Sequence, residues 1–391
     1  MNSIFNGGKI RIDLTYTKYR VLREVALEMN WKVITAKRKE NADNAAETKE
    51  KKGKESNSQQ QMSKEEKEKF NKEELLRQGN VDIIWNDVTI PSEKLSQLKG
   101  FQRVNHFPAM SGVTKKSQLA MSLKKMKNQY PIDFGFFPKT WIIPHQLSKL
   151  RSDITKEKEA NRNPIMIVKP SEASQGRGIF FINDVERLKE TLNLDHMAKN
   201  STQANKLLSQ PHVVQRYVPN PYLLDGLKFD LRLYVVVTSC QPLTIFWHKE
   251  GIARFATQPY SLKAGKEMPQ LAHLTNYAIN KDSAGFKITE EEIAAGTSSK
   301  RTLETVYKRL AADGVDINLL KLKIADLIIK TLISVQPDLL HNYRTCQPND
   351  RTFNMCFEVL GFDVLIDSDT KPWLLEVNQA PSFQTDSELD Y

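Results

Sequence analysis

The pattern of apolar and polar positions near the C-terminal end of the chain predicts a β-hairpin. Two runs rich in Val, Ile and Leu within residues 355–379 flank a Ser-Asp-Thr-Lys-Pro break. A polar break between two such runs is typical of a hairpin turn. With the turn centred near Asp369 and Thr370, Asp363 falls opposite Glu376. Because directly paired residues have Cβ atoms roughly 4.5–5.5 Å apart, the pattern predicts two neighbouring carboxylates.

The predicted hairpin places a third polar group beside these carboxylates. Asn378 lies two residues beyond Glu376, and the period of two along a strand puts both side chains on one face. Like charges directly opposite each other are destabilising, so we expect a cation between Asp363 and Glu376. Oxygen ligands without Cys or His favour Mg²⁺ over zinc. The alternative is an exposed hairpin face that carries ordinary surface acids.

The N-terminal part of the chain combines short apolar runs with one amphipathic segment, which predicts a small α/β domain over residues 8–98. A tract at about residues 36–78 interrupts it and is rich in Lys, Glu, Asn, Gln and Ser. Such a tract cannot bury enough surface to offset its ordering entropy, so we expect a disordered insertion in a surface loop. The elements expected around it are strands at residues 10–14, 32–35 and 81–85 and a helix at residues 19–29.

Strand-like and helix-like segments continue to alternate through the rest of the chain. This alternation predicts a mixed α/β (α+β), enzyme-like architecture. The expected helices cover residues 115–127, which are rich in Lys, and residues 319–334. The expected strands begin at about residue 136 and then cover residues 165–168, 179–182 and 228–238, with a strand-to-loop junction at residues 213–218.

A glycine-containing loop, Gln175–Gly178, connects two of the expected strands. A Walker or Rossmann loop would instead open a helix. Gly176 and Gly178 allow the backbone to approach a ligand closely, and exposed N–H groups can hold phosphate oxygens. Arg177 adds a charged donor, and Lys169 at the end of the preceding strand can reach the same phosphates. An ordinary hairpin turn is the alternative.

Three charged residues alternate along a later expected strand, namely Lys228, Asp230 and Arg232. The period of two places them on one face, while the other face carries Phe, Leu and Val. The charged face is therefore either the floor of an active site or a solvated surface with salt bridges.

Composition sets broad limits on the class of protein. The 391 residues are 40% hydrophobic, which is enough for two or three packed domains. The formal charge of +10 suggests nucleic acid, an anionic membrane or an acidic protein as partner. The basic residues lack the interleaved aromatic residues of a protein that binds single-stranded nucleic acid. The chain also has no apolar run of about 18 residues, the length needed to span a bilayer. Three cysteines without a C-x-x-C pair, and an N-terminus without a signal peptide, predict a soluble intracellular protein without disulfides.

Several sequence blocks, found in one order along the chain, resemble those of a known family. They read K-F-D-L-R-L-Y-V-V-V-T-S, A-R-F-A-T, H-L-T-N-Y-A-I-N-K, C-F-E-V-L-G-F-D and W-L-L-E-V-N-Q-A-P-S-F. Together they resemble the tubulin tyrosine ligase-like family of ATP-grasp amino-acid ligases, and H-N-Y and S-F-Q-T-D-S-E-L-D are most similar to its polyglutamylase branch. The resemblance implies an ATP-grasp fold. Its central domain, residues 99–218, would carry the phosphate-binding loop, and its C-terminal domain, residues 219–391, would carry the Mg²⁺ site.

The resemblance also implies a nucleotide site and a metal site. ATP would be held by Lys169, Gln175, Gly176, Arg177, Gly178, Gln215, Arg216, Tyr217, Val218, Lys228, Asp230, Thr275 and Asn276. In this set, Gln215–Val218 would form the interdomain linker around the adenine. The Mg²⁺ ligands would be Asp363, Glu376 and Asn378.

The same resemblance implies an amino-acid site and catalytic residues. The incoming amino acid would contact Arg254, Tyr277, Ala278, Lys300 and Gln379. Arg254 suits this role because a guanidinium can pair with a carboxylate in a bidentate manner. The catalytic residues would be Lys169 and Arg232, with Arg232 either steadying an acyl phosphate or pairing with Asp230.

The implied activity is the ATP-dependent addition of L-glutamate to glutamate side chains in the C-terminal tails of tubulin, through an acyl phosphate. Glycine ligation by the same fold, another acidic protein acceptor and a microtubule-binding pseudoenzyme are the alternatives. Ser174, Ala278 and Gln379 stand where family members often carry Cys, Ser and His. These departures leave open whether glutamate chains are initiated or elongated.

The implied partners are tubulin or microtubules and free L-glutamate, with no nucleic acid and no membrane. We expect a cytoplasmic monomer on the cytoskeleton, and the family suggests a cilium, axoneme or basal body. The chain ends at Tyr391, soon after the last block. We therefore expect no basic extension of the kind that autonomous elongating members use to grip microtubules.

Overall fold

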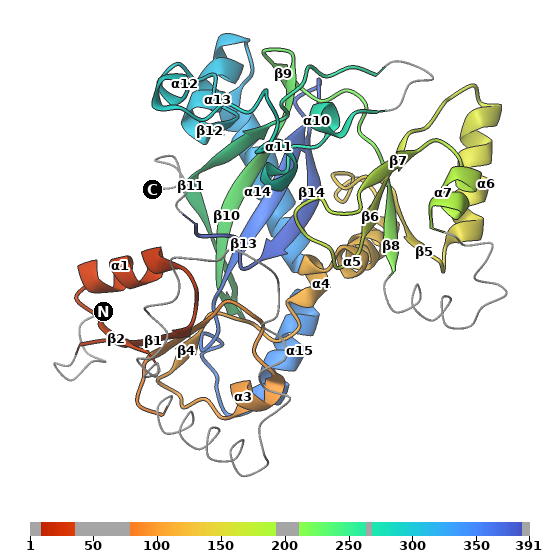
Figure 1. The fold of residues 1–391 in the computed structure, drawn as a ribbon. Coiled ribbons are helices and arrows are strands. Elements are labelled where there is room, and N and C mark those ends of the chain that lie inside the picture. Colours follow the sequence, from red (N-terminus) through yellow and green to blue (C-terminus); the bar gives the residue numbers. More distant parts are fainter. Residues whose placement is uncertain (1–8, 36–78, 193–210, 263–267, 385–391) are drawn as a thin grey trace. The chain divides into compact units, whose positions relative to one another are not determined.

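The computed structural model describes residues 9–35, 79–192, 211–262 and 268–384. The chain divides into two compact units (Figure 1). The first unit comprises residues 1–108 with residues 344–357, and the second comprises residues 109–343 with residues 358–391. The predicted disordered insertion at about residues 36–78 lies outside the described residues.

The first unit is built on a parallel four-stranded sheet in the order β2-β1-β3-β4. Parallel neighbours need a crossover connection, and the amphipathic helix α1 provides it between β1 and β2. The core here consists of Ile12, Leu14 and Ala26, packed against side chains such as Leu22 and Trp31. The predicted strands and helix of this region are confirmed. Their bounds are β1 Arg11–Tyr16, α1 Arg20–Glu28, β2 Lys32–Ile34, β3 Ile83–Asn86, α3 Ser92–Ser96 and β4 Arg103–Val104.

The second unit contains an antiparallel sheet in the order β5-β8-β6-β7. Its strands are β5 Thr140–Ile143, β6 Met166–Pro170, β7 Phe180–Ile182 and β8 His212–Arg216, and its helices are α6 Leu147–Glu159 and α7 Val185–Thr191. One continuous core joins these elements and includes Trp141, Leu150, Val168, Leu188 and Val214. The other face of this sheet is left to line the pocket described below.

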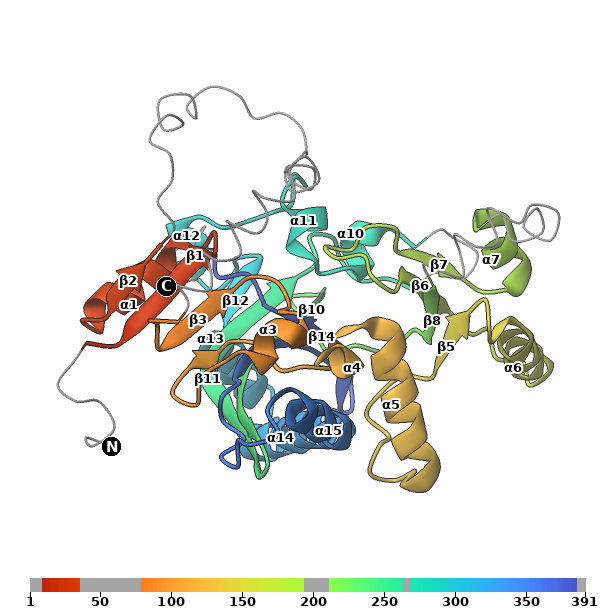
Figure 2. The same cartoon turned by 90° about the horizontal axis from the view of Figure 1, so that it is seen from below.

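A larger antiparallel sheet in the same unit has the order β12-β11-β10-β13-β14, with β9 pairing to β10. Its strands are β9 Leu223–Leu224, β10 Leu227–Cys240, β11 Leu243–Phe255, β12 Lys300–Thr302, β13 Glu358–Ile366 and β14 Pro372–Gln379. Leu231, Leu233 and Val235 of β10 are fully buried on one face. Helix α13, Leu303–Ala312, packs on β11, and helix α14, Ile317–Ile333, packs on β14 (Figure 2).

The predicted hairpin is confirmed in its register. Strands β13 and β14 pair antiparallel, and Asp363 faces Glu376. Thr370 adopts a positive φ of 58° in the turn, close to the predicted centre. The next pair is Val364 with Leu374, so a bulge follows the carboxylate pair.

The remaining helices complete the description of a mixed α/β fold, which confirms the predicted class. They are α4 Ser111–Thr114, α5 Lys116–Gln129, α10 Gln270–His273, α11 Tyr277–Asn280, α12 Glu290–Ala294 and α15 Gln336–Cys346. No helix in the described part of the chain is both long enough and apolar enough to cross a membrane. The division into domains at residues 98 and 218 stays a prediction.

Candidate active site

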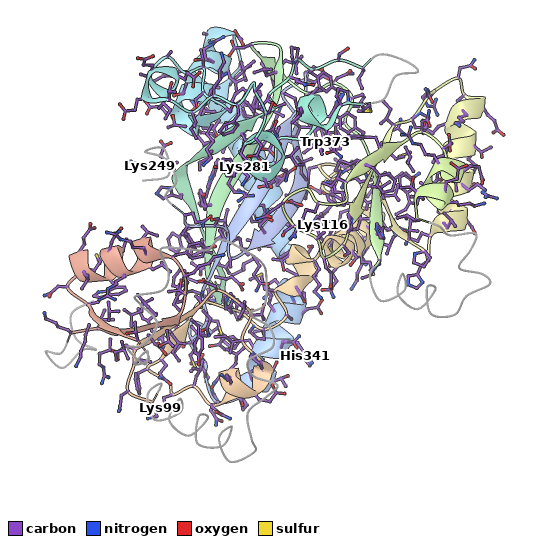
Figure 3. The ribbon with its side chains drawn as sticks, in the orientation of Figure 1. Lys99, Lys116, Lys249, Lys281, His341 and Trp373 are labelled. Atoms are coloured by element: carbon purple, nitrogen blue, oxygen red, sulfur yellow. The ribbon has the colours of Figure 1, made fainter. Side chains whose placement is uncertain are left out.

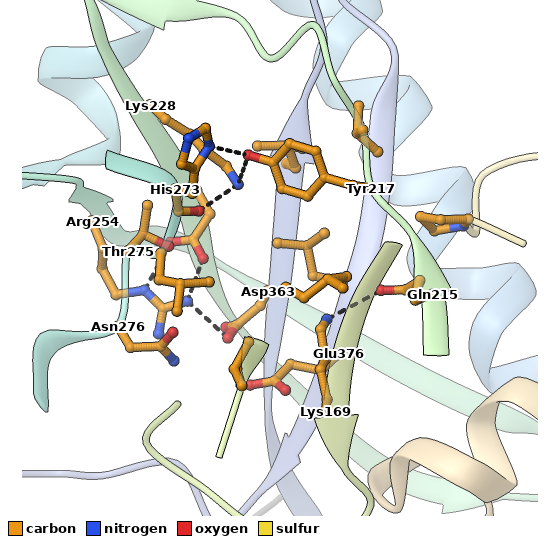
Figure 4. Close-up of a pocket in the computed structure, with 18 of the residues that line it drawn as sticks. Lys169, Gln215, Tyr217, Lys228, Arg254, His273, Thr275, Asn276, Asp363 and Glu376 are labelled. Atoms are coloured by element: carbon orange, nitrogen blue, oxygen red, sulfur yellow. Dashed lines mark hydrogen bonds and ion pairs between the residues drawn. The ribbon is translucent and has the colours of Figure 1, made fainter. Parts of the chain in front are cut away.

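A pocket lies between the two sheets of the second unit (Figure 4). About 620 Å³ of space in it is free of protein atoms, part of it open to solvent. One wall comes from β6 and β8, and the other comes from β10, β11, β13 and β14, with residues 273–276 between them. The predicted site residues that line it are Lys169, Gln215, Arg216, Tyr217, Val218, Lys228, Asp230, Arg254, Thr275, Asn276, Asp363 and Glu376.

An aromatic cluster with a buried lysine forms one end of the pocket. The Tyr217 hydroxyl lies 2.9 Å from His273 Nδ1. Lys228 Nζ donates to the Tyr217 hydroxyl at 3.1 Å and to the His273 carbonyl at 2.7 Å. The rings of Phe181 and Tyr260 contact the His273 ring edge-on, with distances between ring centroids of 5.7 Å and 5.0 Å. Tyr217, His273 and Lys228 line this end of the pocket, and we call this aromatic end, edged by polar atoms, the slot.

Burial shifts the titration of this cluster. It lowers the pKa of Lys228 to about 7, although the charge of Asp230 opposes the shift. It also lowers the pKa of His273 to about 4, and the nearby charge of Lys228 adds to the effect. His273 is therefore neutral at pH 7, so its Nδ1 can accept the proton of the Tyr217 hydroxyl while Lys228 donates to that oxygen.

Lys228 provides the first testable prediction. Because its pKa in the folded chain is about 7 and its ordinary value is about 10.4, the unfolded chain binds more protons between these values. The free energy of unfolding should therefore rise with pH from about 7 towards 10. Replacing Lys228 with Met should remove this rise, as measured by guanidinium denaturation at pH 7, 8 and 9. Parallel pH curves for the wild type and Lys228→Met would contradict the prediction.

Lys169 stands at the centre of the pocket. Its Nζ donates to Gln215 Oε1 at 3.1 Å, and Gln215 Nε2 donates in turn to Thr140 Oγ1 at 3.1 Å. The two residues come from neighbouring strands, because β6 pairs with β8. Burial lowers the pKa of Lys169, while the carboxylate of Glu376 opposes the shift. Lys169 is thus a buried cation aimed between the slot and the carboxylates.

Four charged side chains form a ladder across β11, β10 and β13. Arg254 faces Asp230 in the strand register, and Arg232 faces Asp363. Arg254 donates to both Asp230 oxygens, at 2.8 Å and 2.6 Å, and its Nη2 lies 2.8 Å from Asp363 Oδ2. Arg232 donates to Asp363 at 2.5 Å and 3.1 Å. The predicted alternative of an Arg232–Asp230 pair is wrong, because cross-strand register gives each aspartate a different arginine.

The ladder controls the charge of Asp363. Burial works to raise the pKa of this carboxyl, but the guanidinium groups of Arg232 and Arg254 outweigh it and hold the pKa well below the ordinary value. For Arg254, burial works to lower the pKa, and the carboxylates of Asp230 and Asp363 hold it well above the ordinary value. Asp363 and Arg254 are therefore both charged at neutral pH.

Glu376 and Asn378 stand on the same face of the hairpin, as predicted. Glu376 Oε2 lies 3.4 Å from Lys116 Nζ, and Glu376 Oε1 accepts from Asn378 Nδ2 at 3.4 Å. Lys116 also donates to the Ala173 carbonyl at 2.9 Å, and Figure 3 labels it at the start of α5. The expected cations between the two carboxylates are thus supplied in part by protein side chains.

The chemistry of this donor set fits Mg²⁺. In the described part of the chain, no three His, Cys, Asp or Glu side chains are grouped so as to hold a metal. The set around the hairpin instead offers two carboxylates and one amide, all of them oxygen donors of the kind that Mg²⁺ takes. A metal at this place would compete with Lys116 for Glu376 and with the two arginines for Asp363.

The glycine-containing loop is bent as its sequence suggests. Gln175, Gly176 and Gly178 have φ values of 62°, 78° and 72°. A Cβ at Gly176 would clash with the side chain of Ile279 and would lie 3.2 Å from Cγ of Asn276. The loop therefore packs closely against the segment that ends the pocket wall. In the described part of the chain, Ile179 lines the pocket, and residues 175–178 of the loop do not.

The residues predicted to hold the amino acid are only partly brought together. Lys300 faces Arg254 in the strand register, and its Nζ lies 4.7 Å above the Tyr277 ring. Tyr277 and Ala278 belong to α11. In the described structure, Tyr277, Ala278, Lys300, Gln379, Arg232 and Asn378 are not among the residues that line the pocket.

Gln379 is directed away from this face. It follows Asn378 by one residue, so strand alternation turns it to the opposite side of the hairpin. Its Nε2 donates to Glu358 Oε1 at 2.7 Å, and Glu358 is fully buried. The predicted contact of Gln379 with the amino acid stays a prediction, and it would require this side chain to leave Glu358.

Three polar residues in or near the pocket were given no role by the sequence analysis. Lys116 and His273 are described above, and the third is Asn280. Its Oδ1 accepts from Thr257 Oγ1 at 2.8 Å, and its Nδ2 donates to the carbonyls of Leu274 and Asn276 at 2.8 Å and 3.0 Å. A buried amide that joins two segments has no sequence signal of its own, although His273 and Asn280 both fall in the H-L-T-N-Y-A-I-N-K block.

Comparison with known proteins places the chain in a family. The model of the tubulin-tyrosine ligase family matches residues 93–391. The chain is 42% identical over 310 residues to a probable beta-tubulin polyglutamylase of Tetrahymena thermophila, covering 79% of this chain and 24% of that protein. It is 40% identical over 320 residues to human tubulin polyglutamylase TTLL6, covering 81% and 33%. It is 38% identical over 313 residues to tubulin polyglutamylase TTLL7 of Xenopus tropicalis, covering 79% and 32%.

The chain therefore belongs to the tubulin-tyrosine ligase family, and the resemblance seen in the sequence blocks is confirmed. The matched region is well over half of this chain. The alignments with the three relatives span only about a quarter to a third of the length of those proteins.

Proposed function

We propose that this protein is an ATP-dependent ligase that adds L-glutamate to glutamate side chains in the acidic C-terminal tails of tubulin. The observation that carries the proposal is the convergence of Asp363, Glu376 and Lys169 beside the aromatic slot of one pocket. That arrangement suits a nucleoside triphosphate with its metal, and the similar relatives are named tubulin polyglutamylases.

The nucleotide assignment follows the polarity of the pocket. The adenine would occupy the slot formed by Tyr217, His273 and Lys228, with Gln215–Val218 along its edge. Asp230, Thr275 and Asn276 would face the ribose. The phosphates would extend towards Lys169, covered by the loop Gln175–Gly178, so that a nucleotide lies between two sheets in the manner of an ATP-grasp fold.

The metal assignment places Mg²⁺ at Asp363, Glu376 and Asn378. When bound there, the ion would shield the negative charge of the phosphates. Arg232 and Arg254 hold the Asp363 carboxylate ionised and fixed in direction. Arg232 therefore acts through Asp363, and Lys169 is the cation with direct access to the phosphates.

The chemistry requires activation of a carboxylate that is a poor electrophile. The acceptor carboxylate attacks the γ-phosphorus of ATP, which forms an acyl phosphate and releases ADP. The amine of glutamate then attacks the acyl carbon, the bond to phosphate breaks, and a proton passes to water as the isopeptide bond forms. Lys169 stabilises the charge that develops on the transferring phosphoryl group, since fixed cations in a dry site act strongly on such charge.

The amino acid would bind beside the ladder, near Lys300 and Tyr277. Arg254 is paired with Asp230 and Asp363. Lys300 faces it on β12, and both cations would border the α-carboxylate. Tyr277 and Ala278 would border this subsite, and Gln379 would join it only after rotation. Tubulin or microtubules would be the macromolecular partner, which implies a place on the cytoskeleton, including cilia or basal bodies.

Intact-mass spectrometry of synthetic tubulin-tail peptides tests the proposal. The peptides are incubated with the protein, Mg²⁺ and either L-glutamate or glycine, with and without ATP. We expect ATP-dependent mass steps of one glutamate residue. Steps of one glycine residue would overturn the choice of amino acid, and no step with either amino acid would overturn the proposed activity for this chain.

A further inference from the structure

Helix α5 carries a basic surface that the proposed catalytic chemistry does not use. The helix, Lys116–Gln129, contains Lys116, Lys124, Lys125 and Lys127 and no acidic residue. Leu119, Ala120 and Leu123 are buried beneath it, while Lys124, Lys125 and Lys127 are exposed. We call these three lysines, with their exposed neighbours Met121, Tyr130 and Ile132, the α5 surface.

The positive charge of the α5 surface is not neutralised within the described structure. Lys124, Lys125 and Lys127 form no ion pair among the described residues, and the acids nearest the ends of the helix are already engaged. Asp133 pairs with Lys330 at 3.0 Å, and Glu172 pairs with Lys115 at 2.8 Å.

A fourth cation reinforces the α5 surface. Lys371 donates to the Gly135 carbonyl at 2.9 Å and lies 3.9 Å above the Trp373 ring. Burial lowers the pKa of Lys371, and the charge of Lys127 lowers it further, against the effect of Asp367. Lys371 and Lys127 are therefore close enough for their charges to act on each other.

Apolar groups accompany this charge. Met121, Tyr130 and Ile132 are 52%, 53% and 94% exposed. Met121 lies on α5, and Tyr130 and Ile132 follow its last turn in the chain, so this segment offers both ionic and apolar contacts to a polypeptide. Phosphate backbones and lipid headgroups would use only the charge, so the composition of the α5 surface favours a protein partner.

The α5 surface leads directly to the candidate active site. Lys116 Nζ in the first turn lies 3.4 Å from Glu376 Oε2, and Figure 2 shows α5 extending away from β14. At about 1.5 Å of rise per residue, Lys124 and Lys127 lie about 12 Å and 16 Å along the axis from Lys116. Extended chain covers at most about 3.3–3.6 Å per residue, so roughly five residues of a bound peptide span this distance.

We propose that the α5 surface binds the acidic polypeptide segment next to the glutamate that is modified. The partner is a protein segment with several carboxylates and some apolar residues, which under the proposed function is the tubulin tail. Lys124, Lys125 and Lys127 pair with its carboxylates, and Met121 and Ile132 contact its apolar side chains. The surface acts by holding the acceptor, not by taking part in bond formation.

The test measures binding of a fluorescein-labelled tubulin-tail peptide by anisotropy at low and high salt. The variant replaces Lys124, Lys125 and Lys127 with Glu, and the control replaces the exposed Lys156, Lys158 and Lys323 with Glu. Both variants lose the same formal charge. We expect the α5 variant to bind at least about tenfold more weakly at low salt, with a smaller difference at high salt, because exposed ion pairs are screened. The control should stay within about twofold of wild type.

Two further readouts make the outcome decisive. In glutamate addition, the KM for the peptide should rise in the α5 variant while kcat and the KM for ATP stay unchanged. Equal weakening by both variants would show a non-specific charge effect and overturn the proposal. Loss of binding to phosphatidylserine vesicles or to single-stranded RNA, with unchanged peptide binding, would assign the surface to another partner and also overturn it. Because peptide binding is read without turnover, an inactive wild type would count against the proposed function and not against this surface.

Discussion

Replacing Glu376 with Gln is expected to lower kcat for glutamate addition by roughly 100- to 1,000-fold, the range found when one group that stabilises a transition state is removed. The substitution keeps the size of the side chain but removes the charge that faces Asp363 and lies 3.4 Å from Lys116. A neutral amide is a weaker Mg²⁺ ligand than a carboxylate, so the triphosphate would lose part of its shielding. The rate is measured as product formed per enzyme at saturating ATP, glutamate and peptide.

Glu172→Gln is the matched control for this experiment. Glu172 is exposed, and its carboxylate pairs with Lys115 at 2.8 Å. Lys115 directly precedes Lys116 in the chain. Its loss should change kcat by less than about twofold, because exposed ion pairs contribute little. Near-normal turnover by Glu376→Gln, with a normal fold by circular dichroism, would contradict the assignment of the hairpin carboxylates.

Replacing Asp363 with Asn should destabilise the protein strongly as well as inactivate it. Asp363 is buried and holds both Arg232 and Arg254 through hydrogen bonds. Its neutral analogue would leave two largely buried guanidinium groups, 15% and 13% exposed, with the single carboxylate of Asp230. Removing one partner of a buried ion pair costs about 3–5 kcal/mol, and we expect a loss of this size in the free energy of unfolding by guanidinium denaturation.

The pH dependence of this loss distinguishes a charge effect from a packing effect. The pKa of Asp363 is held well below its ordinary value, which is about 4. The contribution of the Asp363 charge to the free energy of unfolding is therefore fully present above pH 4. It is lost as the pH falls below 4 towards the folded-state pKa. The difference between wild type and Asp363→Asn should shrink over that range. A constant difference would contradict the electrostatic account, and the exposed Asp369→Asn in the same hairpin should change stability by less than about 0.5 kcal/mol.

The sequence predicted those parts of the site that depend on local periodicity. Asp363 and Glu376 were placed opposite each other because a turn and an alternation of period two determine the register of a hairpin. Lys228, Asp230 and Arg232 were placed on one face for the same reason. The strands and helices around them were found with bounds that differ by a few residues.

Contacts between distant segments could not be predicted in this way. Arg232 reaches Asp363 across 131 positions of sequence, and Lys116 reaches Glu376 from a helix that precedes the whole sheet. Neither pairing has a local pattern, because each depends on which strands or helices become neighbours. The same limit explains why Asp230 and Asp363 were not predicted as the partners of Arg254. Gln379 is a different case, because strand alternation alone places it on the face opposite Asn378.

The central claim is that the acceptor carboxylate is phosphorylated before the amine attacks it. The most direct measurement uses a tubulin-tail peptide whose glutamate side chains carry ¹⁸O in both carboxylate oxygens. After incubation with the protein, ATP, Mg²⁺ and L-glutamate, the released phosphate is analysed by mass spectrometry. The account predicts one ¹⁸O atom in phosphate for each glutamate residue added. Glutamate addition with unlabelled phosphate would contradict it.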